Sequence, residues 1–318
     1  MPQAPVQAPP GQRRSEHPWG LAVRLRRTAA GCGMSDVASR EGHWTAPSSA
    51  STYAYRIWHP DATRALVVLV HGFGEHAGRY GPFATALARQ GICVAAPDLW
   101  GHGRSGGQRG DLPSLKRLVQ HLSALAQAVF VPHAGMTRYA LFGHSFGGLV
   151  AIQWALEHPA AVDRLIVQSP LLEVGFPIPW WEAAGAACCA VLWPRCAFSM
   201  NLDVHRLSHD PAVVQAYQRD PLVHHWMTAR AYHETLRARD EALARAATVR
   251  QPVLLLCGGE DRIVSVEAAE RWLARVPGPT RCVKFPHAYH ELHHEDVNGD
   301  VLRLVSEWVL PPQGAGTS

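Results

Sequence analysis

The 318-residue sequence predicts an α/β protein with a mostly parallel central sheet and helices on both faces. Short runs rich in Val, Leu and Ile are typical of strands that are buried on both faces. Segments with helical spacing separate these runs, and this alternation favours a parallel sheet. The alternation stops once, over residues 171–239, where Trp, Pro, Cys and Ala are frequent and no strand pattern is visible. We expect this stretch to form an inserted cap over the sheet.

The elements follow from local patterns. Apolar runs predict strands at 53–58, 65–70, 92–96, 138–142, 164–168, 253–257 and 281–285. Helical spacing predicts helices at 80–89, 115–131, 149–157 and about 297–309, with Gly91 and Pro159 as stop signals for the first and third.

Three regions are expected. Residues 1–40 are rich in Pro, Arg and Gly without periodicity, which predicts a disordered leader, and Met34 is an alternative start. Residues 41–170 and 240–312 should form the core, and 171–239 the cap.

The composition narrows the class of protein. Hydrophobic residues make up 47% and charged residues 18%, a globular balance, and the net charge is +4. No dense Lys/Arg run indicates a nucleic-acid partner. No apolar run reaches the roughly 18 residues of a membrane span. The seven cysteines form no C-x-x-C, and Cys93, Cys257 and Cys282 lie in strand-like runs where we expect them buried. This usage favours a reducing compartment and therefore a cytoplasmic location.

One serine stands in a motif with a chemical meaning. Gly143-His144-Ser145-Phe146-Gly147 fits G-x-S-x-G between a predicted strand and a predicted helix, the context that the motif requires. The strained turn needs small neighbours and projects the serine oxygen above the sheet. Ser145 is thus predicted to be a nucleophile; the alternative is a tight structural turn.

A serine nucleophile needs a histidine base, and the histidine needs a carboxylate that fixes its tautomer. With this motif the chain order is Ser, acid, His, each after a strand. Asp261 follows the strand at 253–257, and His290 follows the strand at 281–285. The Asp-x-Ile-Val context favours Asp261 over its neighbour Glu260. The histidines that compete with His290 are His287, His293 and His294.

A metal motif overlaps this histidine. His290-Glu291-Leu292-His293-His294 fits H-E-x-x-H, which on a helix holds zinc with the glutamate as base. A zinc site needs a third ligand and leaves Ser145 and Asp261 unexplained, so we prefer the serine hypothesis and expect no metal.

A tetrahedral intermediate also needs N–H donors for its oxyanion. The backbone N–H of Phe146, directly after the nucleophile, is one candidate. The second is the N–H of Phe73 in the loop His71-Gly72-Phe73-Gly74, where glycines allow close backbone approach. The alternative for this loop is a glycine-rich turn without a catalytic role.

Four segments resemble one family. Residues 71–80 are similar to its HGxGEHxGRY segment, and 98–105 to its DxxGHGxS segment. Residues 143–148 are similar to GHSMGG with Phe in place of Met, and 220–223 resemble the end of its cap. On these segments the sequence resembles the monoglyceride lipases and related lysophospholipases, from about Glu41 to Trp308. The leader is extra, Thr45 to Ser51 replace the usual turn, and the cap matches poorly.

The resemblance implies the α/β-hydrolase fold with a cap. It also implies hydrolysis of a monoacylglycerol or lysophospholipid to a fatty acid and an alcohol through an acyl-enzyme, without metal or organic cofactor. It suggests that Glu75, Arg79 and His293 line the pocket for the alcohol. The alternative is a structural Glu75–Arg79 pair at a helix start. Asp98 precedes the nucleophile and is expected to be structural.

Other functions fit parts of the pattern. A short-chain esterase, thioesterase, peptidase or acyltransferase could use the same fold, and a non-catalytic binding module could retain it. A haloalkane dehalogenase would have Asp at position 145. Apolar cap residues should pack the cap or line an acyl site, and a transient membrane contact is a further hypothesis. They are Phe176, Ile178, Trp180, Trp181, Val191, Leu192, Trp193 and Phe198.

Overall fold

The computed structural model describes residues 26–27, 37–47, 49–175, 185, 188–200 and 202–310. Most of the expected leader, including Met34, lies outside these residues. The same holds for Phe176, Ile178, Trp180 and Trp181 of the expected cap.

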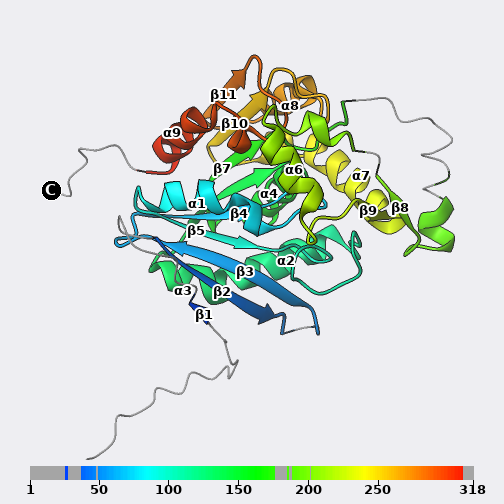
Figure 1. Ribbon diagram of the computed structural model, residues 1–318, viewed down its shortest axis with the longest axis horizontal. Coiled ribbons are helices and arrows are strands. Elements are labelled where there is room, and N and C mark those ends of the chain that lie inside the picture. The colour runs from blue at the N-terminus through cyan, green and yellow to red at the C-terminus, as the bar shows by residue number, and fades with distance from the viewer. Residues whose placement is uncertain are drawn as a thin grey trace, which may run out of the picture.

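The described residues form a nine-stranded sheet in the order β1-β2-β3-β5-β4-β6-β7-β10-β11 (Figure 1). The six strands from β5 to β11 pair in parallel, and β1, β2 and β3 add an antiparallel edge. The strands are β1 Arg26–Arg27, β2 Ala38–Thr45, β3 Thr52–His59, β4 Ala65–Val70, β5 Ile92–Pro97, β6 Tyr139–His144, β7 Val162–Gln168, β10 Val253–Gly258 and β11 Thr280–Phe285. The predicted α/β class and mostly parallel sheet are confirmed.

Helices cover both faces of the sheet. On one face lie α1 Gly81–Ala88 and α9 Asn298–Val309, and on the other lie α2 Leu115–Leu125, α4 Phe146–Glu157 and α8 Val266–Leu273. Strand side chains alternate between these two cores: Val68 and Val70 of β4 enter one, and Val67 and Leu69 enter the other. The continuous apolar runs follow from this two-sided burial.

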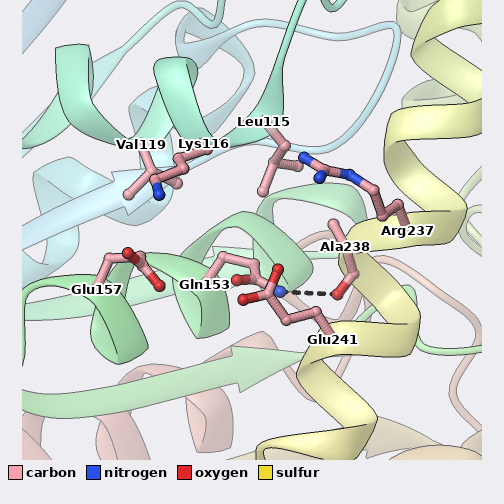
Figure 2. Close-up of a pocket in the computed structure, with 8 residues that line it drawn as sticks. All are labelled: Leu115, Lys116, Val119, Gln153, Glu157, Arg237, Ala238 and Glu241. Atoms are coloured by element: carbon pink, nitrogen blue, oxygen red, sulfur yellow. Dashed lines mark hydrogen bonds between the residues drawn. The ribbon is translucent and has the colours of Figure 1, made fainter.

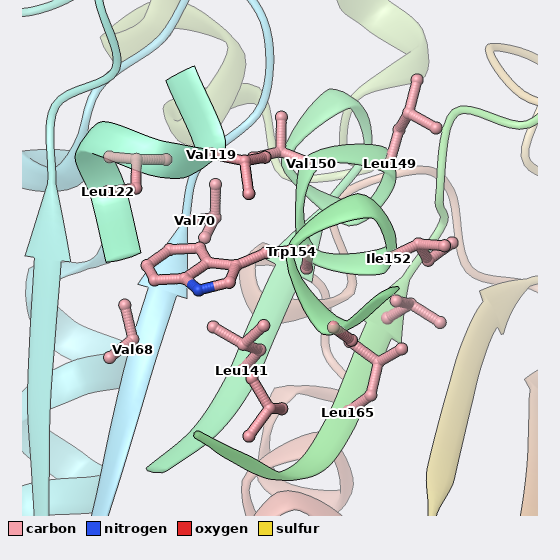
Figure 3. Packing of buried hydrophobic residues seen from close by; sticks show 14 of the residues in the cluster. Val68, Val70, Val119, Leu122, Leu141, Leu149, Val150, Ile152, Trp154 and Leu165 are labelled. Atoms are coloured by element: carbon pink, nitrogen blue, oxygen red, sulfur yellow. The ribbon is translucent and has the colours of Figure 1, made fainter. Parts of the chain in front are cut away.

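The larger core packs around Trp154 of α4. Its indole is fully buried near Val70 and Leu141 (Figure 3), and its N–H donates to the hydroxyl of Tyr139 at 3.1 Å. A buried indole requires such a partner for its one polar atom. The contact fixes α4 on β6, and therefore fixes the turn between them.

The elements between β7 and β10, in the segment that was predicted to form the cap and is called the cap below, gather at one end of the sheet (Figure 1). Their bounds are β8 Ala197–Ser199, α6 Pro211–Arg219, β9 Trp226–Thr228 and α7 Ala229–Ala244. The Thr228 N–H donates to the Gly110 carbonyl at 3.1 Å, and Asp111 accepts from the Thr228 hydroxyl and the Arg230 guanidinium. This polar anchor joins the cap to the core.

Several boundaries differ from the sequence predictions. The strand β2 begins at Ala38, before the expected core start at 41. Its place near the sheet edge and its partly exposed side chains explain why no continuous apolar run marked it. The cap contains the short pair β8–β9, although no strand was expected there. The expected cap boundary at 239 falls inside α7, whose Ala238 and Ala242 enter the larger core. The helix predicted at 115–131 has a π-helical turn at Ala126–Phe130.

Two of the three cysteines expected to be buried, Cys93 and Cys257, are buried, but Cys282 is exposed, so that prediction was wrong for it. Cys282 lies on β11, the edge strand, whose outer face meets solvent. Among the described residues, no helix has the length and apolar character needed to cross a membrane.

Candidate active site

Ser145 stands at the turn between β6 and α4. Its backbone adopts φ 54° and ψ −119°, a strained conformation for a residue with a side chain. A Cβ at Gly147 would lie 2.2 Å from the Val70 carbonyl oxygen and 2.4 Å from that of His71. Only glycine permits this approach, so the end of β4 lies against the first turn of α4. The predicted strand–turn–helix context of Ser145 is present.

Asp261 and His290 meet as a buried pair. The His290 Nδ1–H donates to Asp261 Oδ2 at 2.7 Å, and the other carboxylate oxygen accepts from the N–H groups of Ile263 and Val264. Burial disfavours both charged forms, but each partner stabilises the charge of the other. The pKa of His290 is therefore raised and that of Asp261 lowered from the ordinary values. His290 Nε2 remains as the basic nitrogen.

The structure separates this pair from the competing residues. Glu260 is exposed and accepts a hydrogen bond from the exposed His287 at 3.2 Å. His293 and His294 are turned away from Asp261, since their neighbours are Gln168 and each other.

The contacts of the residues next to Ser145 place this serine near His290. The His144 ring centroid is 4.6 Å from that of His290, and the Ser145 N–H donates to the Gln168 carbonyl at 3.0 Å. Within the described part of the chain, Ser145 Oγ and His290 Nε2 are not hydrogen-bonded to each other. Such a bond commonly tightens only when substrate binds.

The expected oxyanion donors lie on the two sides of Ser145. Phe146 is the first residue of α4, where the backbone N–H has no acceptor within the helix. A Cβ at Gly72 would lie 3.5 Å from Ser145 Cβ, so the loop with Phe73 runs next to the serine. The rings of Phe73 and Phe146 meet edge to face at 5.5 Å. Phe73 and Phe146 therefore lie next to each other, close to Ser145.

The cap also contacts this loop. The His224 N–H donates to the Gly74 carbonyl at 2.8 Å, and the His76 Nε2–H donates to Asp220 Oδ2 at 2.8 Å. Gly74 has a φ of +79°, and a Cβ there would lie 2.3 Å from the His224 carbonyl oxygen. The Phe73 loop therefore depends on the cap for its position.

Glu75 and Arg79 form a buried ion network. Arg79 donates to Glu75 at 2.5 Å and to both carboxylate oxygens of Glu291 at 2.7 Å. The Gly72 N–H and the Tyr80 hydroxyl also donate to Glu75. Burial opposes ionisation, but the Arg79 charge holds the pKa of Glu75 and of Glu291 below the ordinary range. Glu75 and Arg79 thus form the pair that the structural alternative describes, and Glu291 joins them as a third member that was not predicted.

His293 has a different environment. It is buried, stacks on Tyr80 at 4.4 Å, and accepts at Nδ1 from the Gln168 side-chain amide at 2.8 Å. Its Nε2 is buried without a partner in the described part of the chain. Gln168 was not predicted as a site residue; the available signal was a glutamine at the end of the apolar strand β7, which pairs with β6 before Ser145.

The zinc motif is not formed. H-E-x-x-H chemistry needs an α-helix, but the segment ends in the 3₁₀ turn Leu292–His294. His290 is bonded to Asp261, and Arg79 binds both oxygens of Glu291. Glu291, His293 and His294 offer atoms within 4.8 Å of one another, but the Arg79 cation already neutralises this carboxylate.

Asp98 supports the site as expected. Its carboxylate accepts from the Ala77 and Arg104 N–H groups, which closes the loop after β5 against the loop after β4.

Two cavities lie away from Ser145. One of about 250 Å³ lies between α2, α4 and α7, where the Gln153 amide donates to the Ala238 carbonyl (Figure 2). The other, about 870 Å³, lies between α6 and the core and is lined in part by Arg79, Asp220 and His294. Neither is lined by Ser145 or His290, so neither defines an acyl site.

The sheet order and the strained turn at Ser145 define an α/β-hydrolase. The family described as serine aminopeptidase, S33, matches residues 61–297. The chain belongs to this family and is a serine hydrolase.

Named relatives cover most of the chain. It is 32% identical to the monoacylglycerol lipase of Mycolicibacterium smegmatis over 275 residues, 86% of this chain and 98% of that protein. It is 30% identical to the monoglyceride lipase of Rattus norvegicus, over 80% of this chain and 85% of that protein. The crystal structure of the Paleococcus ferrophilus monoacylglycerol lipase is similar with a TM-score of 0.72 at 30% identity, over 81% of this chain and 97% of that one. The fold and family expected from the sequence are confirmed.

The Asp261–His290 pair yields a prediction. The substitution Asp261→Asn should lower the pKa of His290, because it removes the negative charge that stabilises the imidazolium. Histidine NMR titration measures this pKa, with His290→Gln to assign the signal. The matched control is Glu260→Gln, which should leave the His290 titration unchanged; an effect of Glu260 equal to that of Asp261 would contradict the assignment.

Proposed function

We propose that this serine hydrolase cleaves the ester of a monoacylglycerol or lysophospholipid through an acyl-enzyme on Ser145. The buried Asp261–His290 pair beside the strained Ser145 turn carries the proposal. The similarity to monoacylglycerol lipases over most of the chain supports a lipid-like ester as substrate.

The geometry supports a two-step reaction. As Ser145 Oγ attacks the ester carbonyl, its proton moves to His290 Nε2, and Asp261 stabilises the resulting imidazolium. The Phe73 and Phe146 N–H groups would bind the oxyanion. The imidazolium then protonates the departing alkoxide oxygen and leaves the acyl group on Ser145. Water, deprotonated by His290, attacks the acyl carbonyl and releases the fatty acid as Ser145 regains its proton.

The alcohol pocket is the second part of the proposal. Glu75 and Arg79 are bonded to each other, so their contribution is to shape the wall. His293 Nε2 is buried and has no partner among the described residues, which makes it the available polar atom for a glycerol hydroxyl.

The cap carries an apolar segment suited to a lipid surface. Val191, Leu192 and Trp193 are consecutive and 82%, 66% and 69% exposed. Arg195 follows them, and its carbonyl accepts from the Gln108 side chain at 3.1 Å, which ties the segment to the core. Such a segment can enter the headgroup region while the core stays in water. We propose that it makes transient contact with membranes, at the membrane side of a cytoplasmic compartment.

Hydrolysis of a monoacylglycerol series tests the reaction. The wild type should show a maximum kcat/KM for long acyl chains, and Ser145→Ala should lose on the order of 10⁴-fold or more in kcat. Lysophosphatidylcholine, p-nitrophenyl butyrate, an acyl thioester and an aminoacyl amide in parallel separate the alternatives. A preference for the short soluble ester would indicate a general esterase, and full activity of Ser145→Ala would contradict the proposal.

Vesicle sedimentation tests the membrane contact. The double substitution Leu192→Ser and Trp193→Ser should weaken binding to phosphatidylcholine vesicles at least about tenfold, because it removes the apolar area that would be buried. The kcat/KM for p-nitrophenyl butyrate should stay unchanged. Trp226→Ser is the matched control, a half-exposed tryptophan outside the segment. Equal vesicle binding by wild type and double variant would exclude this surface.

A further inference from the structure

We propose that Gln168 is a positioning residue whose side-chain amide keeps the imidazoles of His144 and His293 neutral, so that His290 alone accepts the Ser145 proton. The proposal rests on the proposed function of Ser145 and His290. It assigns a role to a buried amide that the reaction itself does not use.

Gln168 lies where three parts of the site meet. It is the last residue of β7 and pairs in register with His144 at the end of β6. Its side chain is buried, and its Nε2 lies 3.0 Å from His144 Nδ1 and 2.8 Å from His293 Nδ1. Its carbonyl accepts the Ser145 N–H. One residue thus binds both rings and the backbone of the nucleophile.

The amide dictates which nitrogen of each ring carries the proton. An amide NH₂ group is a donor only, so each Nδ1 that it contacts must be an unprotonated acceptor. His144 and His293 therefore carry their protons on Nε2. Protonation of either Nδ1 would place two N–H groups against each other and lose the hydrogen bond.

The opposite amide orientation is less favourable. In the observed orientation, Gln168 Oε1 and His293 Nε2 are the buried atoms of this group without partners in the described part of the chain. Turning the amide would leave both of its N–H protons unpaired, together with His293 Nε2. Buried unpaired N–H groups are rarer and costlier than under-used carbonyl oxygens.

A second charged ring here would disturb catalysis. The centroid of the His144 ring lies 4.6 Å from that of His290 and 5.1 Å from that of His293. An imidazolium at either position would repel the one that forms on His290 and reduce its proton affinity. A single proton acceptor requires the other rings to stay neutral.

His144 faces acidic groups that favour its protonation. They are Glu75, Glu291 and Asp261, and the opposing positive influence is His290. Burial dominates and lowers the pKa of His144 to about 4. The amide N–H of Gln168 adds to burial by occupying the nitrogen that a proton would take.

His293 lies among groups that disfavour a positive charge on its ring. Tyr80 stacks on one side, and His294, His144, Arg79 and His290 all disfavour a positive charge on the ring. Burial is again the largest cause, and the pKa of His293 lies well below the ordinary value. By contrast, the pKa of His290 is raised by Asp261.

The strand end that carries Gln168 is itself rigidly held. Ser169 has a φ of 45°, and its hydroxyl donates to the His290 carbonyl at 3.1 Å. Its N–H donates to the Leu256 carbonyl at 2.9 Å. The backbone next to the amide is thereby fixed to the His290 loop, so the distance between the amide and the rings is fixed as well.

Nitrogen-15 NMR of the histidine rings tests the proposal in wild-type protein. At pH 7, His144 and His293 should show a protonated Nε2 and an unprotonated Nδ1, with His144→Asn and His293→Asn to assign the signals. A protonated Nδ1 on either ring would overturn the proposal. This measurement needs no substrate, so it stands whether or not the chain hydrolyses lipid esters.

Two variants test the consequence for catalysis. In Gln168→Glu, the new carboxylate can accept a hydrogen bond from a protonated Nδ1. The spectrum at pH 7 should therefore show a protonated Nδ1 on His144 or His293. The acid limb of the kcat/KM profile should become steeper, because more than one ring then takes up a proton over the same pH range. In Gln168→Met, which removes the amide without adding charge, kcat should fall at least about tenfold with little change in KM.

Gln153→Met is the matched control. Gln153 is also a buried glutamine, and its amide donates to the Ala238 carbonyl, away from the rings of His144, His290 and His293. It should lower the melting temperature without changing the pH profile. Wild-type pH profile and kcat in both Gln168 variants would overturn the proposal. If wild type failed to hydrolyse every ester tested, the proposed function would fail instead.

Discussion

The close approach between α4 and the end of β4 is the constraint on which the site depends. Gly147 has no side chain, so the carbonyls of Val70 and His71 can lie against the helix start. This contact forces the chain through the strained conformation of Ser145 and turns its side chain out of the sheet. The same contact brings the Phe73 loop beside Phe146. One packing interaction thus positions both Ser145, the candidate nucleophile, and the candidate oxyanion donors.

The buried charges of the site are compensated by partners from different loops. The Arg79 guanidinium satisfies Glu75 and Glu291, which come from the loops after β4 and β11. Asp261 is satisfied by His290 and two backbone N–H groups. A buried charge without its partner would be costly, so each of these ion pairs keeps the loops that carry it in one arrangement. The imidazoles between them lie in a region where small changes in hydrogen bonding decide which ring is charged.

The sequence predicted the features that depend on local pattern. The strand at 65–70 and the order of Ser145, Asp261 and His290 follow from apolar periodicity and from the rule that these residues follow strands. The Glu291 ion pair and the Gln168 amide depend on partners 212 and 125 residues away, which periodicity cannot show. The H-E-x-x-H pattern was not interpreted as a zinc site, and the backbone at its end is a 3₁₀ turn and not the α-helix that the motif requires. The strand β2 was missed because it lies near the sheet edge and lacks a continuous apolar run.

We propose that His290 activates Ser145 and that Asp261 orients His290 and stabilises its charged form. The most direct measurement is reaction of the folded protein with a fluorophosphonate, followed by peptide mapping by mass spectrometry. The account predicts one adduct, on Ser145, that forms at least about a hundredfold more slowly in His290→Ala. An unlabelled Ser145 in folded wild type, or equal labelling rates with and without His290, would contradict it.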